Sequence, residues 1–294
     1  TDLNQLDLAF FRRSTKGKIP VTKTSLAPNA INQKAINVRN ILRNRGTSGR
    51  DLKTLLIRCS RHGQTAAQLY VKTEDFPKFS EDEFKKSELD SLEIIYSNPK
   101  SPASIITKRL QKWGIKALQD EILNTRFNYA TEGFFQINLP VYEQALLDMK
   151  SWINHDINVV DLYSGVGSIG LTIGGNNVTL VEINENAVRE MQKNIKILCK
   201  NAKAILAPSE KALEYISKDS LIIVDPPRAG LHKDVIDKLI SEKPKRIIYL
   251  SCNPVTQARD IAKLSEKYGI KAHRGYNFFP KTPHIEHLAI LDLY

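Results

Sequence analysis

Two places in the chain combine glycine and carboxylate residues in a spacing that suits a nucleotide-like ligand. The segment Asp161 to Gly170 contains G-x-G-x-x-G at Gly165, Gly167 and Gly170. Glycines at this spacing let the backbone turn tightly and approach such a ligand closely. Glu182 follows 21 residues after Asp161, where a carboxylate can accept hydrogen bonds from both ribose hydroxyls. The pattern fits a dinucleotide or S-adenosylmethionine equally, and a turn without a ligand is the plainer alternative.

A second segment, Asp225 to Gly230, places a carboxylate before two prolines and an arginine. The prolines stiffen the loop and hold Asp225 at the tip of an apolar run. In methyltransferases that act on exocyclic amines, an aromatic residue follows a similar Asp-Pro-Pro and stacks on the base. Arg228 stands at that position here, which ranks amino-group methylation lower. We assign Asp225 to the site and Arg228 to substrate contact, with a plain turn as the alternative.

Cys252 is a candidate nucleophile because of where it falls. It follows an apolar run, Arg246 to Leu250, and precedes a predicted helix. Helix-terminal N–H groups and their partial positive charge are expected to favour the thiolate. Cys59 and Cys199 are interpreted as buried apolar residues. Three widely spaced cysteines cannot form a disulfide framework or a zinc cluster, so no metal site is predicted.

The segment Phe278 to His287 brings one carboxylate and two histidines before the last apolar run. Glu286 is a candidate general base. His284 and His287 could act as bases instead, and spacing does not choose among the three. For each histidine alone, a loop residue without a catalytic role is the commoner interpretation.

The elements that must position these segments alternate between strand and helix. Continuously apolar runs separated by helices of about 10 to 15 residues predict a doubly wound, mostly parallel α/β sheet covered on both faces. Ligands bind beyond the carboxyl ends of the strands in such sheets, which is where the candidate residues fall. We predict strands at 159–163, 178–182, 221–224, 246–250 and 285–293, and helices at 141–153, 185–200, 233–241 and 255–268.

The amino-terminal part has a different pattern. Short apolar runs at 52–57 and 68–71, together with a helix at 30–45, predict an α+β domain. We place the domain boundary between residues 125 and 126. This gives an α+β domain at 1–125, to which we assign RNA contact, and a catalytic α/β domain at 126–294.

The positive charge is concentrated at the front of the chain. Lys and Arg outnumber Asp and Glu by 43 to 32 over 294 residues, a net charge of +11. Residues 1–50 alone hold ten of these cations and two aspartates, a net charge of +8. Arg12 and Arg13 directly follow Phe10 and Phe11, a combination that suits a phosphate backbone flanked by stacked bases. A solvated basic face is the alternative.

Other compositional features disfavour whole classes of protein. The chain is 41% hydrophobic and 26% charged, which is typical of a globular protein. No apolar run approaches the roughly 18 residues that span a bilayer, and no apolar signal segment opens the chain. We therefore expect a cytoplasmic protein without membrane contact, and nothing in the sequence indicates an obligate protein partner.

Taken together and in order, the motifs of residues 130–294 resemble those of the uracil-5 RNA methyltransferases. These are S-adenosylmethionine-dependent enzymes that make 5-methyluridine in ribosomal or transfer RNA. The resemblance implies a Rossmann-like methyltransferase domain, with Cys252 as nucleophile, Glu286 as base and Asp225 as a further catalytic-site residue. It rests on segments 134–138, 161–170, 181–182, 225–230, 251–260 and 284–286. It also implies cofactor contacts by Gln136, Tyr163, Gly165, Gly167, Ser168, Glu182 and Asp225, of which Ser168 stands where a relative has Asn.

The chemistry that the resemblance implies explains why both Cys252 and Glu286 are needed. Uracil C5 is a poor nucleophile until a thiolate adds to C6, and a base must later remove the C5 proton so that the cysteine can leave. The target base must first leave its stack. Cytosine-5 RNA enzymes carry a second cysteine near the Asp-Pro-Pro segment, and its absence here favours uracil.

The chain also departs from this family. Many relatives carry an amino-terminal RNA-binding β-barrel and a four-cysteine iron–sulfur cluster, for which this chain has neither the length nor the cysteines. We therefore expect no iron–sulfur cluster, and either a shortened chain or a reduced member of the family. The alternatives kept open are methylation of cytosine C5 or another RNA base, a nicotinamide-dependent oxidoreductase, and a non-catalytic RNA-binding protein.

Overall fold

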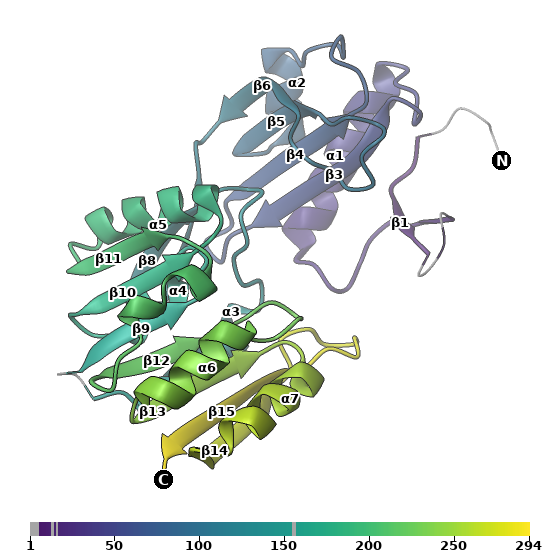
Figure 1. Ribbon diagram of the computed structural model, residues 1–294. Helices are drawn as coiled ribbons and strands as arrows, with labels where there is room; N and C mark the ends of the chain where they lie inside the picture. Colours follow the sequence, from purple (N-terminus) through teal and green to yellow (C-terminus); the bar gives the residue numbers. More distant parts are fainter. Residues whose placement is uncertain (1–5, 13–14, 16, 155–156) are drawn as a thin grey trace. The chain divides into compact units, whose positions relative to one another are not determined.

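The chain forms two compact units, and the computed structural model describes residues 6–12, 15, 17–154 and 157–294 (Figure 1). The boundary predicted between residues 125 and 126 falls in the stretch where the chain passes between the units, and it stays a prediction. A short hairpin, β7 (Leu118–Ile122) and β8 (Thr125–Tyr129), lies in this stretch. Unit 1 comprises Thr1–Asp120 and Ala130–Glu132, and unit 2 comprises Glu121–Tyr129 and Gly133–Tyr294.

Unit 1 has a four-stranded sheet with two helices packed on one face. Val38 of α1 and Phe84 of α2 pack in one apolar cluster with Leu69 and Leu92 of the sheet. Strands β4 and β5 are parallel, and the other neighbours are antiparallel. The sheet order is β3 (Leu52–Cys59), β4 (Thr65–Val71), β5 (Ser91–Tyr96), β6 (Lys108–Gly114); the helices are α1 (Asn29–Asn44) and α2 (Glu81–Ser87), and β1 (Ala9–Phe11) pairs with β2 (Lys18–Pro20).

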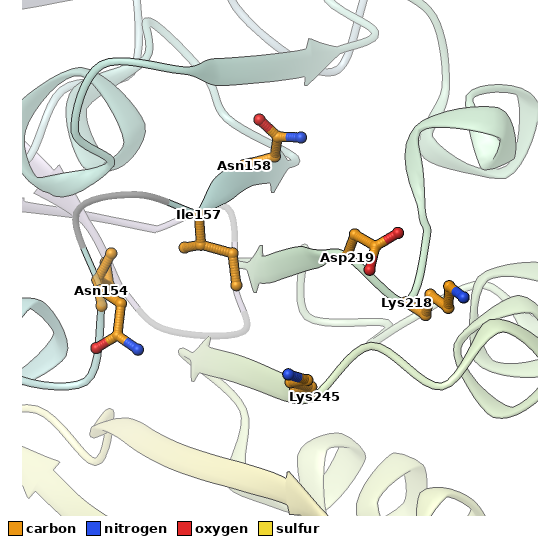
Figure 2. Close-up of a pocket in the computed structure, with 7 residues that line it drawn as sticks. Asn154, Ile157, Asn158, Lys218, Asp219 and Lys245 are labelled. Carbon is orange, nitrogen blue, oxygen red and sulfur yellow. The ribbon is translucent and has the colours of Figure 1, made fainter.

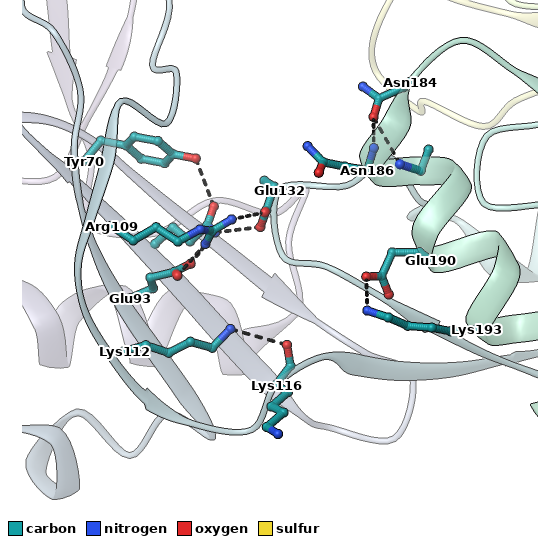
Figure 3. Close-up of polar contacts among 12 residues, drawn as sticks. Tyr70, Glu93, Arg109, Lys112, Lys116, Glu132, Asn184, Asn186, Glu190 and Lys193 are labelled. Atoms are coloured by element: carbon teal, nitrogen blue, oxygen red, sulfur yellow. Dashed lines mark hydrogen bonds and ion pairs between the residues drawn. The ribbon is translucent and has the colours of Figure 1, made fainter. Parts of the chain in front are cut away.

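The opposite face of this sheet carries a buried polar network (Figure 3). Gln68 Nε2 donates hydrogen bonds to the carboxylates of Glu93 and Glu132, both at 2.8 Å. Arg109 forms ion pairs with the same two carboxylates, and Tyr70 OH donates to Gln68 Oε1 at 2.9 Å. A buried carboxylate needs such partners because desolvation of an unpaired charge is costly. The network therefore holds Glu132 within unit 1.

Unit 2 is built on a seven-stranded sheet. The first five strands in spatial order are parallel, and β15 runs antiparallel between β13 and β14. This confirms the predicted doubly wound, mostly parallel sheet. The order is β11 (Ala202–Leu206), β10 (Val178–Glu182), β9 (Asn158–Leu162), β12 (Ser220–Val224), β13 (Arg246–Ser251), β15 (Glu286–Leu293) and β14 (Tyr268–Tyr276).

Helices cover both faces of the unit 2 sheet. Val160 and Val181 share a buried cluster with Val235 of α6, whereas Gly170 of α4 lies against Leu180. Because neighbouring residues of a strand point to opposite faces, α4 and α6 lie on opposite sides of the sheet. Helices α6 and α7 are neighbours (Figure 1). The helices are α3 (Leu139–Lys150), α4 (Ser168–Ile173), α5 (Glu185–Ile197), α6 (Lys233–Glu242) and α7 (Pro254–Leu264).

The sequence predicts the inner strands of unit 2 better than its edges. The strand predicted at 178–182 has those bounds in the structure. The helix predicted at 255–268 is too long, because α7 ends at Leu264 and Tyr268 begins β14. The edge strands β11 and β14 are absent from the sequence prediction, since many of their residues are exposed or half-buried and no continuous apolar run marks them.

Within the described ranges, no helix is long and apolar enough to cross a membrane. The same residues contain no group of three or more His, Cys, Asp or Glu side chains that could hold a metal ion. The cytoplasmic location stays a prediction.

Candidate active site

The sheet register places Cys252 opposite Glu286. Strand β13 ends at Ser251, which pairs with His287 of the antiparallel strand β15. Cys252 follows Ser251 and Glu286 precedes His287, so continuation of the same register sets Cys252 opposite Glu286, and the charge of Glu286 raises the pKa of Cys252. Directly opposed residues of an antiparallel pair have Cα atoms about 4.5 to 5.5 Å apart. The two sequence-predicted reactive groups therefore meet at the carboxyl-terminal edge of the parallel strands.

Glu286 is a buried carboxyl group, with 4% of its surface exposed. The pKa of Glu286 is raised to about 8, mainly by burial and also by the nearby carboxylate of Asp225, against the opposing charge of Arg228. A carboxyl group with such a pKa is a stronger base, once ionised, than one in water.

Cys252 precedes helix α7, as predicted, but its environment does not favour the thiolate in the free protein. Burial is the main cause that raises the pKa of Cys252, and the charges of Glu286 and Asp225 add to it. Arg228 lowers that pKa through its charge and a side-chain hydrogen bond, without reversing the shift. The expectation from the helix terminus alone is therefore wrong in sign, because two carboxylates and burial outweigh a partial positive charge.

The loop after β12 carries Asp225 and Arg228, and the charges of both act on Cys252. Burial raises the pKa of Asp225 to about 7. The carbonyl oxygen of Arg228 accepts hydrogen bonds from Asn253 Nδ2 at 2.9 Å and from Thr256 Oγ1 at 3.1 Å. The Arg228 guanidinium lies 3.4 Å from His284 Nε2. The start of α7 thus fixes the loop that carries both charged residues beside Cys252.

Asp260 of α7 anchors the other end of that loop and was not singled out from the sequence. This fully buried side chain accepts hydrogen bonds from Leu231 N at 2.8 Å and from Tyr249 OH at 2.9 Å. Gly230 has a φ of 82°, and a Cβ there would collide with Asp260 Oδ2. A glycine is therefore required at this turn for steric as well as conformational reasons.

The glycine segment after β9 forms a tight turn held by two carboxylates. Gly165 and Gly167 have positive φ values of 57° and 83°. Glu182 Oε2, at the tip of β10, accepts a hydrogen bond from Gly165 N at 2.9 Å. Asp161 Oδ2 accepts one from Gly170 N at 2.9 Å, and its second oxygen is buried without a hydrogen-bond partner among the described residues. Burial is the main cause that raises the pKa of Asp161 to about 8.

Tyr163 and Ser168 flank this turn but use their hydroxyls within the protein. Tyr163 has a φ of 62°, an uncommon value for a residue other than glycine, and His232 N lies 3.5 Å from its hydroxyl oxygen. The Tyr163 ring packs against the cluster on the α6 face. The Ser168 hydroxyl shares a hydrogen bond of 2.8 Å with Tyr142 OH, which is buried on α3.

Gln136 has an amide that is free to bind a ligand. Among the described residues, its side chain makes no hydrogen bond, and it is half-buried. Its neighbours are fixed on both sides, since the ring of Phe135 stacks on Tyr129 with centroids 4.1 Å apart and Asn138 Nδ2 donates to Phe278 O at 3.1 Å. The segment at 134–138 therefore presents Gln136 from a rigid support.

The histidine alternatives to Glu286 have other contacts. His284 is exposed and lies against Arg228, and His287 Nδ1 lies 2.6 Å from Gln257 Oε1. Gln257 and Asp260 lie in the segment 251–260 that carries the family resemblance, but the sequence gave neither a role of its own, because a polar residue on a helix is ordinarily solvent-exposed.

The structure describes two of the three arginines assigned to RNA contact. Arg228 lies beside Cys252. Arg12 is exposed next to β1, whose Phe10 and Phe11 are 54% and 66% exposed, and it belongs to unit 1. Arg13 lies outside the described residues.

A cavity of about 810 Å³ lies elsewhere in unit 2 (Figure 2). It is lined by Asn158, Asp219 and Lys245, which lie at the amino-terminal ends of β9, β12 and β13. Parallel strands place their carboxyl ends at the opposite edge of the sheet, where Cys252 and Asp225 lie. The geometry of the reactive residues locates the site, because the large cavity contains none of them.

The sheet order and the groups at its edge define a methyltransferase fold. The structure superposes on Pyrococcus abyssi tRNA (uracil-54, C5)-methyltransferase, solved with S-adenosyl-L-homocysteine, with a TM-score of 0.84 and 24% identity over 98% of this chain and 75% of that one. The tRNA m1G37 methyltransferase of M. jannaschii gives a TM-score of 0.53 at 12% identity, over 83% of this chain and 76% of that one.

Sequence comparison identifies the family within that class. The model of the tRNA (uracil-5-)-methyltransferases matches residues 115–293. An uncharacterised RNA methyltransferase of Lactobacillus johnsonii is 31% identical over 98% of this chain and 69% of its own length, and one of Enterococcus faecalis is 30% identical over 98% and 68%. The chain belongs to the tRNA (uracil-5-)-methyltransferase family and is an RNA methyltransferase.

Proposed function

We propose that this protein transfers a methyl group from S-adenosylmethionine to C5 of a uracil in RNA, through a covalent bond between Cys252 and C6. The observation that carries the proposal is the register that sets Cys252 opposite Glu286, with Arg228 and Asp225 beside them. A cysteine and a separate buried base are the two groups that this chemistry requires.

The residues around the glycine turn fit the cofactor. The unpaired oxygen of buried Asp161 and the free amide of Gln136 are polar groups without partners among the described residues. Glu182 stands at the tip of β10, where a carboxylate can accept hydrogen bonds from ribose hydroxyls. When bound, S-adenosylmethionine supplies a methyl group activated by a sulfonium. Gln136, Tyr163, Gly165, Gly167, Ser168, Glu182 and Asp225 would hold it.

The protein's own groups perform the remaining steps. Cys252 loses its thiol proton to solvent, Sγ bonds to C6, and the electron pair of the C5=C6 bond makes C5 nucleophilic. After C5 has gained the methyl group, Glu286 takes the C5 proton, and the released electron pair restores C5=C6 as the Sγ–C6 bond breaks. Arg228 favours the ionised form of both groups, because its charge lowers the pKa of Cys252 and of Glu286.

Tritium release from RNA that carries 5-tritiated uridine tests this proposal. The wild-type chain should release tritium in the presence of S-adenosylmethionine, and Cys252→Ala should abolish the release because no C6 adduct can form. Cys199→Ala is the matched control, since Cys199 lies just after α5 and is exposed, which makes its interpretation as a buried residue wrong. Tritium release by Cys252→Ala at the wild-type rate would eliminate the covalent mechanism.

RNA is the proposed substrate class, and the target nucleotide is to be found by experiment. The related structure from P. abyssi is of an enzyme that acts on uracil 54 of tRNA, which makes tRNA the first RNA to examine. Mass spectrometric mapping of 5-methyluridine in RNA from cells with and without the gene identifies the position. A change at cytosine instead would favour the cytosine-5 alternative.

A further inference from the structure

Gln257 is a buried side chain that joins the two strands of the catalytic edge. It belongs to α7 and is 1% exposed. Its Nε2 donates to Tyr249 O on β13 at 2.9 Å and to His287 O on β15 at 3.0 Å. Its Oε1 lies 2.6 Å from His287 Nδ1. One amide therefore contacts the strand that leads to Cys252 and the strand that begins with Glu286.

The two carbonyl contacts fix the orientation of this amide and the tautomer of the histidine. Carbonyl oxygens only accept hydrogen bonds, so the amino group of Gln257 must face Tyr249 and His287. Its Oε1 therefore accepts a hydrogen bond from Nδ1–H of His287. The other ring nitrogen of His287 lies 3.3 Å from His273 Nδ1. Every polar atom of the Gln257 amide thus has a specific partner.

The contact between Gln257 and His287 lies on the face of β15 opposite to the side chain of Glu286. Neighbouring residues of a strand point to opposite sides of a sheet, so Gln257 holds His287 on the α7 face while Glu286 faces Asp225 and Arg228. The chain before Glu286 gives it little support, because residues 280–285 are all exposed. The start of β15 depends on its pairing with its neighbouring strands and on the Gln257 amide.

We propose that Gln257 and His287 are positioning residues that hold Glu286 opposite Cys252 for removal of the C5 proton. The inference rests on the proposed function, in which adduct formation needs Cys252 and adduct resolution needs Glu286. A displaced base leaves the first step intact and slows the second. Loss of this contact should therefore trap the covalent adduct, an effect that general destabilisation does not produce.

The test uses the full chain, S-adenosylmethionine and labelled total RNA from cells that lack the gene. Gln257→Leu should slow tritium release by about 10- to 100-fold, the range expected when a catalytic group is displaced by about 1 Å. The same variant should accumulate a protein–RNA band on a denaturing gel, as Glu286→Gln should. The initial rate at which labelled methyl groups enter the covalent band should stay near that of Glu286→Gln.

Two further variants separate positioning from folding. His287→Leu removes the hydrogen bond to Gln257 Oε1 but leaves the Tyr249 and His287 carbonyls paired with Gln257 Nε2, so this variant should fold and trap a smaller amount of adduct. His287→Asn supplies a similar donor and should restore resolution of the adduct. Asn194→Leu is the matched control, because the side chain of buried Asn194 forms its hydrogen bonds within the described residues with the backbone of Asn128. It should leave the ratio of adduct to product unchanged.

The possible outcomes distinguish this inference from the proposed function. If Glu286→Gln traps adduct while Gln257→Leu and His287→Leu resolve it as the wild type does, the positioning role is wrong. If Gln257→Leu does not fold, His287→Leu alone decides, and normal resolution in it overturns the inference. If neither Glu286→Gln nor the wild type ever forms adduct or releases tritium, the proposed function itself fails.

Discussion

Three buried carboxyl groups of unit 2, two of them near Cys252, keep their protons to an unusually high pH. Burial is the main cause for each, and it raises the pKa of Glu286 and Asp161 to about 8 and that of Asp225 to about 7. A base of this kind takes a carbon-bound proton more readily than an ordinary carboxylate. The same burial makes the ionised form of each group costly in the folded protein. Function and stability therefore oppose each other at this site.

Replacement of Glu286 by glutamine should stabilise the protein at alkaline pH. The pKa of Glu286 is about 8 in the folded protein and 4.5 without the interactions of the fold. Between pH 4.5 and pH 8, Glu286 therefore holds a proton in the folded state that it has lost in the unfolded state. Stability consequently falls as the pH rises through this window. Glu286→Gln should exceed the wild type in free energy of unfolding by about 4 kcal/mol at pH 8 and match it near pH 4.

Urea unfolding at both pH values measures that difference. Asp148→Asn serves as the control, because the half-buried carboxylate of Asp148 is paired with Arg274 and accepts a hydrogen bond from Tyr276 OH, so its loss should give no such gain. Equal stability of Glu286→Gln and the wild type at pH 8 would mean that Glu286 is ionised without penalty in the folded protein.

At the level of elements, α7 organises the site. Its first residues fix the loop that carries Arg228, its buried Asp260 anchors Leu231 at the end of that loop, and Gln257 contacts β15. The helix begins two residues after Cys252. The positions of Cys252, Arg228 and Glu286 therefore all depend on α7, and a shift of that helix would move the three residues together.

Gly230→Ala tests the packing of the loop against α7. A Cβ at this position would collide with Asp260 Oδ2. Alanine would also have to adopt a φ of 82°, which is strained for a residue with a side chain. We therefore expect a loss of about 2 kcal/mol in the free energy of unfolding. Gly63→Ala is the matched control, because Gly63 has a φ of 85° with open space around it and should lose only about 1 kcal/mol. Thermal unfolding of the two variants gives the comparison, and equal losses would show that the Asp260 contact is not limiting.

The sequence predicts the inner strands of unit 2 better than the edge strand β14. The strand predicted at 178–182 is mostly buried and has the predicted bounds, whereas most residues of β14 are exposed or half-buried and no strand is predicted there. Motifs indicated Cys252 and Glu286, but the register that opposes them depends on pairing between β13 and β15, which no local pattern encodes. The contacts of Gln257 were unpredictable for the same reason.

At the level of the whole molecule, the basic front of the chain is less available than its net charge of +8 suggests. Arg45 forms an ion pair with Glu83 at 2.5 Å and donates to Pro77 O at 2.9 Å. Arg43 pairs with Asp7 at 2.6 Å, and these contacts fold unit 1 instead of binding a polyanion. Among the described residues, the exposed cations of this region without a side-chain partner are Arg12, Lys18, Lys23 and Arg50.

This division of charge predicts which cations set the salt dependence of RNA binding. Each cation that contacts a phosphate contributes about 0.7 to 0.9 to the slope of log affinity against log salt concentration, because it releases counterions. The double variant Arg12→Ala, Lys18→Ala should therefore lower the slope for unmodified transcribed tRNA by about 1.5. Arg45→Ala should reduce stability and leave the slope unchanged, since Glu83 already neutralises that guanidinium. Equal slopes for the double variant and the wild type would move the RNA contact away from β1 and β2, toward the cations beside Cys252.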